Sequence, residues 1–294
     1  MTKNYYERRA KEIVQEARTR KGEADSPPEP PKVSKSKEKA LAQVIQLQLW
    51  PETQRVAPNV MLRSALFAVV KKGERKQFKK QLLASWPATE IRFTGEQLDQ
   101  FDETVWFETV HLAAEHSRNK TVAQFKLGGF LRRLGLNKDG RSMKRLDAAF
   151  TRMIACEVRI QGDGFHYRDN MLGIHVDESS GVYTVRLNPA LVQLFDAGIT
   201  RVEWETRLAL RTDLAKWLHG FVLSHRADER HPQRVAVATL SELSGVTTEL
   251  KDFRRKLKDS MRQLHELGLV SSWRITENDA LEYTRARRKT LNER

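Results

Sequence analysis

The sequence has 294 residues, of which 39% are hydrophobic, and its 52 Lys and Arg residues outnumber 38 Asp and Glu residues to give a formal net charge of +14. No apolar run approaches the ~20 residues that a membrane-spanning helix needs, the charged N-terminus does not fit a signal peptide, and Cys156 as the one cysteine excludes a disulfide framework and a multi-cysteine metal site. We therefore expect a cytoplasmic protein of about two domains with no membrane partner, whose basic excess favours a polyanionic partner such as nucleic acid.

Residues 1–57 are predicted to form a disordered N-terminal tail. The tract KGEADSPPEPPKVSKSKEK carries four prolines and mixed charge, and its one large apolar side chain is Val33. Such a tract cannot bury enough surface to offset the entropy of ordering it. Near its end the tail nevertheless contains the peptide QLQLW (46–50), whose apolar side chains have no obvious core nearby.

Residues 58–200 are predicted to form a first domain. A helix is expected over 94–117, followed by a strand in TVAQFKL, a short helix in GGFLRRLGL and a longer helix over 141–155. The segment 156–187 then reads as strands joined by turns at 162–164 and 178–181.

Residues 201–294 are predicted to repeat this order as a second domain. A helix over 210–226 precedes a strand in QRVAVATL, a short helix in SELSGV, a long helix over 247–268 and two strands joined by a turn at 277–279. Helix, strand, helix, helix and a two-stranded wing is the order of a winged-helix module, a variant of the helix-turn-helix. The sequence thus predicts an α+β protein with two tandem winged-helix domains.

Basic residues collect on the helix that precedes each predicted wing. On 247–268 the apolar residues share one face of the helix and the basic residues another, and in a winged helix this element enters the major groove. Arg159 and Arg168 are expected on the first wing. The candidate DNA-binding residues are Arg141, Lys144, Arg145, Arg152, Lys251, Arg254, Arg255, Lys258, Arg262 and Arg274.

Motifs for catalysis are missing from the sequence. It contains no GxxxxGK[ST] phosphate-binding loop, and its eight histidines are scattered, with His111 and His116 five residues apart. We expect no enzymatic activity, no cofactor and no metal.

From APNVMLRSALFAVVKK (57–72) onward, through IRFTGEQLDQFDETVW, FLRRLGL and GRSMKRLDAAFTRM, the sequence resembles the TrfA family of plasmid replication initiators. The resemblance implies binding of double-stranded DNA at repeated origin sequences (iterons), opening of the adjacent DNA, and contacts with the host initiator and the replicative helicase. It also implies an equilibrium between monomer and homodimer, for which the strands around 156–187 are the candidate interface.

The family resemblance also suggests a role for the peptide QLQLW. Family members carry a related peptide, of the form Gln-Leu-x-Leu-Phe, similar to those that dock on the bacterial sliding clamp. Here Gln46, Leu47, Leu49 and Trp50 stand at its positions, with Trp50 in place of Phe. The alternative is that these side chains pack back on the first domain.

The sequence therefore predicts a plasmid replication initiator in the bacterial cytoplasm. One alternative is a winged-helix transcriptional repressor, which has no use for a clamp-docking peptide. A second is a nicking replication enzyme, which needs a nucleophile beside a histidine cluster that the sequence does not offer.

Overall fold

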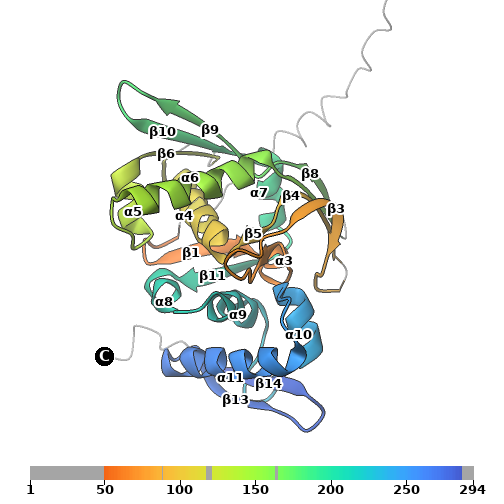
Figure 1. Ribbon diagram of the computed structural model, residues 1–294. Helices are drawn as coiled ribbons and strands as arrows, with labels where there is room; N and C mark the ends of the chain where they lie inside the picture. The colour runs from red at the N-terminus through yellow and green to blue at the C-terminus, as the bar shows by residue number, and fades with distance from the viewer. Residues whose placement is uncertain (1–49, 88, 117–120, 163–164, 287–294) are drawn as a thin grey trace, which may run out of the picture. The chain divides into compact units, whose positions relative to one another are not determined.

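The computed structural model describes residues 50–87, 89–116, 121–162 and 165–286, which mix helices and strands (Figure 1). All of these described residues belong to one compact unit. No helix among them combines the length and the apolar character needed to cross a bilayer.

Helix α4 (Gln100–His116) runs through the middle of the first part of the fold. Nearly all of its residues are buried, including three carboxylates that each meet an arginine from another element. Asp102 binds Arg152, Glu103 binds Arg207, and Glu108 binds Arg55 and Arg133. Buried carboxylates require such partners, so the arginines fix how the surrounding elements meet α4.

Helix α4 and five later elements form a set of six that we call the first repeat. After α4 come β6 (Val122–Lys126), α5 (Leu127–Arg133), α6 (Gly140–Ala155), β9 (Leu172–Asp177) and β10 (Val182–Leu187). Asp139 caps the N-terminus of α6, because its carboxylate accepts a hydrogen bond of 2.7 Å from the Ser142 backbone N–H. The strands form an antiparallel sheet in the order β6-β10-β9.

Six later elements form a second repeat with the same order. They are α9 (Asp213–Ser224), β12 (Gln233–Ala236), α10 (Val237–Ser244), α11 (Leu250–Glu266), β13 (Val270–Ile275) and β14 (Ala280–Arg285). Their sheet has the order β12-β14-β13. In both repeats, therefore, the strand between the first two helices pairs with the last strand of the hairpin.

A second sheet accompanies the first repeat. Strands β3 (Gln77–Leu83), β4 (Thr89–Glu96), β7 (Glu157–Gly162) and β8 (Phe165–Asp169) pair antiparallel in that order. The hairpin β7–β8 is thus inserted between α6 and β9 and belongs to a different sheet from the hairpin β9–β10. Arg159 and Arg168, which the sequence analysis assigned to the wing, lie on β7 and β8, so that assignment is wrong.

Short elements complete the fold. They are β1 (Gln54–Pro58), α3 (Asn59–Leu62), β2 (Phe67–Ala68), β5 (Leu98–Asp99), α7 (Pro189–Val192), the 3-10 turn η1 (Gln193–Phe195), β11 (Ile199–Glu203) and α8 (Trp204–Ala209). Strand β1 pairs with β11, and β2 pairs with β5. Residues 54–57, which the sequence analysis placed in a disordered tail, are therefore a strand of the fold. The partner of β1 lies about 145 residues away in the chain, so no local pattern marks it.

The buried apolar side chains form two clusters. The first runs from Ala57 to Trp204 and the second from Leu210 to Tyr283. They are joined by hydrogen bonds from the Trp217 indole N–H to the Ser64 carbonyl (3.1 Å) and from Arg63 Nε to Ser224 Oγ (3.0 Å).

Candidate nucleic-acid interface

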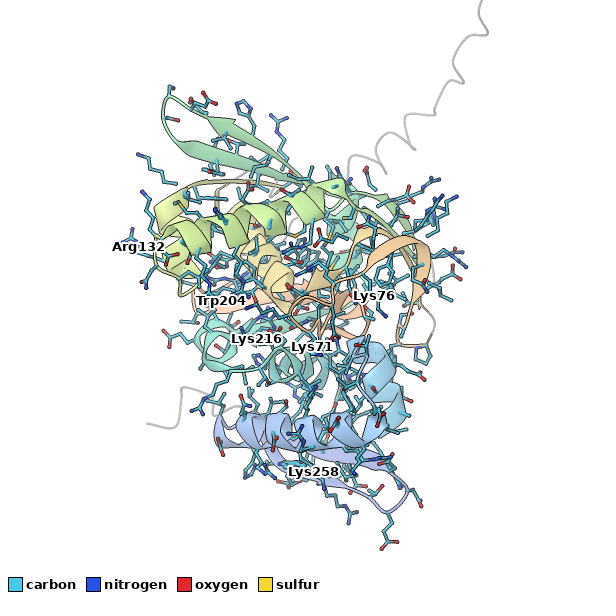
Figure 2. The ribbon with its side chains drawn as sticks, in the orientation of Figure 1. Lys71, Lys76, Arg132, Trp204, Lys216 and Lys258 are labelled. Carbon is cyan, nitrogen blue, oxygen red and sulfur yellow. The ribbon has the colours of Figure 1, made fainter. Side chains whose placement is uncertain are left out.

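Helix α11 has two distinct faces. Phe253, Leu257, Met261 and Leu264 are fully buried in the second cluster. Lys251, Arg255, Lys258 and Arg262 recur at intervals of four, three and four residues, and all four are exposed. This spacing gathers the four cations on one side of the helix (Figure 2 labels Lys258).

Two of these cations have weak partners within α11. Arg255 NH2 lies 3.8 Å from Asp252 Oδ1, and Arg262 NH1 lies 2.5 Å from Asp259 Oδ1. Both pairs are largely exposed, and exposed pairs of this kind contribute little to stability. The two guanidinium groups can therefore exchange a carboxylate for a phosphate or a base edge at small cost.

Arg254 has a different role from its neighbours. Its Nε and NH2 donate to the two oxygens of Asp279, at 2.7 and 2.8 Å, in the turn between β13 and β14. The hydrogen bonds between them raise the pKa of Arg254 and lower that of Asp279. Arg254 thus fixes the hairpin to α11, which argues against the prediction that it reads bases.

Arg274 lies on β13 at the edge of the second repeat. Its side chain is 71% exposed, and its Nε donates to Glu282 Oε1 on β14 at 2.7 Å. It lines a surface hollow of about 330 Å³, together with Arg234, Ile275, Thr276, Glu277, Asn278 and Glu282. Its exposure leaves it available to a phosphate beside α11.

In the first repeat, α6 occupies the place that α11 takes in the second. Arg141 and Lys144 are exposed. Arg145 is exposed too, but its guanidinium lies 3.8 Å above the ring of Phe101 on α4, a cation–π contact. Compared with α11, α6 presents a smaller set of free cations.

Arg152 on α6 belongs to the interior. Its side chain is 10% exposed, and it donates to both oxygens of Asp102 at 2.9 and 2.6 Å. Burial raises the pKa of Asp102 to about 6 in spite of this partner. The placement argues against the prediction that Arg152 contacts DNA; the sequence shows its position on the helix but not its partner fifty residues earlier.

The hairpin of the first repeat is not basic at its tip. Asp177 ends β9, and Glu178 opens the turn that leads to β10. A basic row lies instead on the four-stranded sheet, where Arg92, Arg159 and Arg168 are direct cross-strand neighbours. Glu157 pairs with Arg159 at 2.6 Å and with Arg168 at 3.1 Å. Sequence reasoning missed Arg92, because only the pairing of β4 with β7 brings it to this row.

Of the predicted clamp-docking residues, Gln46, Leu47 and Leu49 lie outside the described residues. Trp50 is partly buried and packs against the first cluster, with its ring centroid 6.0 Å from that of His111. For Trp50 alone, this contact agrees with the packing alternative.

Comparisons with known proteins give the following similarities. The sequence profile of a family described as TrfA protein matches residues 32–285. A search of curated proteins found no match. A crystal structure of domains 2 and 3 of RctB resembles the chain with a TM-score of 0.54 at 13% identity, covering 78% of this chain and 98% of that one. This likeness shows a shared fold.

Two further structures align less well. A second crystal structure of RctB domains 2 and 3 gives a TM-score of 0.46 at 12% identity, covering 74% of this chain and 93% of that one. A crystal structure of the Pi initiator protein in complex with iteron DNA gives a TM-score of 0.46 at 11% identity, covering 63% of this chain and 94% of that one.

Proposed function

Since the chain belongs to the TrfA family, we propose that it is a plasmid replication initiator that binds iterons in origin DNA through two winged-helix modules. The first module is the first repeat and the second module is the second repeat. It acts by binding and assembly and is not an enzyme.

The observation that carries the proposal is the recurrence of one topology with a basic third helix. Each repeat has the element order of a winged helix, and each pairs the strand between its first two helices with the last strand of its hairpin. In the second repeat the third helix, α11, turns four exposed cations outward. A helix of this kind suits the major groove, where Arg and Lys meet phosphates and guanine edges.

Arg255 and Lys258 are the strongest candidates for base or phosphate contacts. Lys251, Arg262 and Arg274 are further candidates for phosphate contacts in the same module. In the first module, Arg141 and Lys144 are the freest cations of α6, and Arg145 is next to them. The fold thus supports the second module as the main reader of sequence.

The proposal is tested by titrating the full chain against duplex DNA that carries its plasmid's iterons. Arg255→Ala should cost ~1–3 kcal/mol of binding free energy if that guanidinium grips a guanine edge, with preference relaxed at one base. Lys258→Ala, if it removes a phosphate contact, should weaken binding to all sequences and reduce the salt slope by about 0.9.

Arg201→Ala is the matched control, because Arg201 is an exposed arginine on β11 rather than on α11. It should bind as the unaltered chain does. Equal affinity for iteron and unrelated DNA would leave a non-specific binder, and unchanged affinity in both α11 variants would remove that helix as the reader.

We also propose that the peptide QLQLW docks on the bacterial sliding clamp. A repressor would not need this peptide, so docking separates the initiator from that alternative. Leu49→Ala should abolish co-purification with the clamp, and Trp50→Ala should in addition lower the melting temperature, since Trp50 packs on the first cluster. Retention of clamp by Leu49→Ala would contradict the docking.

Contacts with the host initiator and the replicative helicase, and a monomer–dimer equilibrium, remain part of the proposal from the family resemblance. Sedimentation of the free chain tests the last of these. A concentration-dependent mass is expected, and a monomer at all concentrations up to about millimolar would contradict it.

A further inference from the structure

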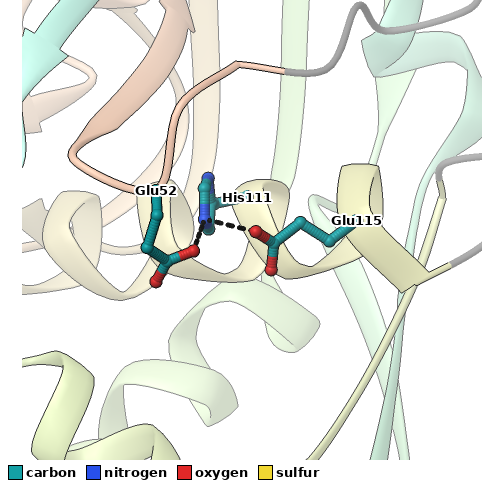
Figure 3. A group of neighbouring side chains, drawn as sticks. All are labelled: Glu52, His111 and Glu115. Atoms are coloured by element: carbon teal, nitrogen blue, oxygen red, sulfur yellow. Dashed lines mark hydrogen bonds and ion pairs between the residues drawn. The ribbon is translucent and has the colours of Figure 1, made fainter.

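Three side chains that the proposed function does not use converge beside α4 (Figure 3). His111 Nε2 lies 3.0 Å from Glu52 Oε2 and 3.1 Å from Glu115 Oε1. The His111 side chain is 1% exposed, whereas those of Glu52 and Glu115 are 58% and 30% exposed. The ring is therefore held by packing, and the carboxylates close the group on the solvent side.

The backbone brings these residues together without needing their mutual attraction. His111 and Glu115 are one turn apart on α4 and so share a face. Glu52 stands in the turn before β1, where its carbonyl accepts a 2.6 Å hydrogen bond from the buried Arg55. The three donor atoms all lie within 4.8 Å of one another.

Arg133 binds the Glu52 carboxylate and lies near that of Glu115. Its NH1 lies 2.7 Å from Glu52 Oε1, and its NH2 lies 4.0 Å from Glu115 Oε2. In each carboxylate, the oxygen that faces Arg133 is thus not the one that faces His111. A contact to the far oxygen of a carboxylate, such as that of Arg133 with Glu52, aims the lone pairs of the other oxygen when it is a metal ligand.

Carboxylates outnumber arginines around this group. Glu52, Glu108 and Glu115 lie beside two arginines, Arg55 and Arg133. A neutral imidazole with a proton on Nε2 can serve as hydrogen-bond donor to one of the two carboxylate oxygens beside it, but not fully to both. A cation between these atoms would satisfy all three.

We propose that His111 Nε2, Glu52 Oε2 and Glu115 Oε1 form a three-ligand Zn²⁺ site that is open to water on its exposed side. Bonds of ~2.0–2.2 Å from one ion to His111 Nε2 and to either carboxylate oxygen about 3 Å from it subtend roughly 90°, which a zinc ion with added water ligands accepts. An imidazole ligand favours zinc over magnesium or calcium. The ion would tie the turn before β1 to α4.

The test uses the full chain, treated with chelator, desalted and titrated with Zn²⁺ by calorimetry. One equivalent should bind, and Glu52→Gln and Glu115→Gln should each weaken that equivalent at least tenfold. Zinc should raise the melting temperature of the unaltered chain and not that of the variants. Co²⁺ in place of zinc should give visible absorption bands that both variants lose.

Glu157→Gln is the matched control. Glu157 is likewise a carboxylate paired with arginines, Arg159 and Arg168, but it lies on the four-stranded sheet away from His111. It should bind zinc as the unaltered chain does. Melting curves without metal establish that each variant is folded. Absence of binding tighter than millimolar, or an equivalent that survives unchanged in Glu52→Gln and Glu115→Gln, would overturn the site and leave an ion-pair cluster.

Discussion

At the scale of single residues, the partners of a side chain decide its role more than its place on a helix. Arg254 and Arg255 are neighbours on α11, yet Arg254 is bound to Asp279 in the hairpin turn while Arg255 is 69% exposed. Both were predicted from the sequence as DNA-binding residues, because the basic face of the helix can be read from periodicity. The ion pair between Arg254 and Asp279 could not be predicted in this way, since it joins residues twenty-five positions apart.

His219 gives a prediction about pH. It is fully buried on α9, and neither ring nitrogen has a hydrogen-bond partner among the described residues. Burial lowers its pKa from 6.5 to about 3. The unfolded chain therefore binds a proton more readily than the folded chain between these values, so stability is lost as pH falls below 6.5, by about 1.4 kcal/mol per pH unit until about pH 3.

His219→Leu, a replacement of similar volume, should remove this loss without harming the fold at pH 7, because an unpaired polar group is exchanged for an apolar one. The free energy of unfolding of both proteins is measured in urea at pH 7, 6 and 5. The difference between them should grow in favour of the leucine variant as pH falls. Parallel pH profiles would show that His219 is protonated equally in both states.

At the scale of elements, prediction succeeded where a segment carries its own periodicity. The expected helices over 210–226 and 247–268 are α9 and α11, each two or three residues shorter at its ends. It failed for β1, which was predicted to be part of the tail and is a strand only through its pairing with the distant β11. The site followed the same rule: the basic face of α11 could be predicted, but the row through Arg92 could not.

Gly245 and Gly268 offer a matched pair that tests how the second repeat packs. Gly245 ends α10 with φ +67°, and Gly268 follows α11 with φ +68°. A Cβ on Gly245 would lie 2.7 Å from the Ala68 Cβ of β2, whereas one on Gly268 would meet nothing within 4 Å. Both alanine substitutions should lower the free energy of unfolding by ~1–2 kcal/mol, because alanine is strained in the left-handed conformation. Gly245→Ala should lower it further, because its Cβ would clash with that of Ala68.

Chemical denaturation of the two alanine variants measures the difference. Gly245→Ala is expected to be the less stable. Equal losses would mean that β2 moves away freely, and hence that α10 is not held against it.

At the scale of the whole molecule, Arg207 on α8 links the segment leading to α9 with the first cluster. Its side chain is fully buried, and its NH2 donates to Glu103 Oε2 on α4 at 2.7 Å. Burial raises the pKa of Glu103 against the effect of this arginine. Removing the arginine would leave a buried carboxylate with no cation.

Arg207→Ala should therefore destabilise the protein by about 3–5 kcal/mol, as the loss of one partner of a buried pair does. The double variant Glu103→Gln with Arg207→Met should recover part of that loss, since neither charge then remains. Urea denaturation of the three proteins makes the comparison. If the single variant loses less than about 1 kcal/mol of unfolding free energy, water reaches Glu103 and the pair does not hold the two segments together.

The central claim, that two modules read one duplex, is tested most directly by a methylation-protection footprint of the full chain on iteron DNA. Two protected major-groove segments about 10 base pairs apart on one side of the duplex are predicted. The double variant Arg255→Ala with Lys258→Ala should lose one segment, and Arg141→Ala with Lys144→Ala should lose the other. A single protected segment, or loss of the same segment in both double variants, would contradict the account.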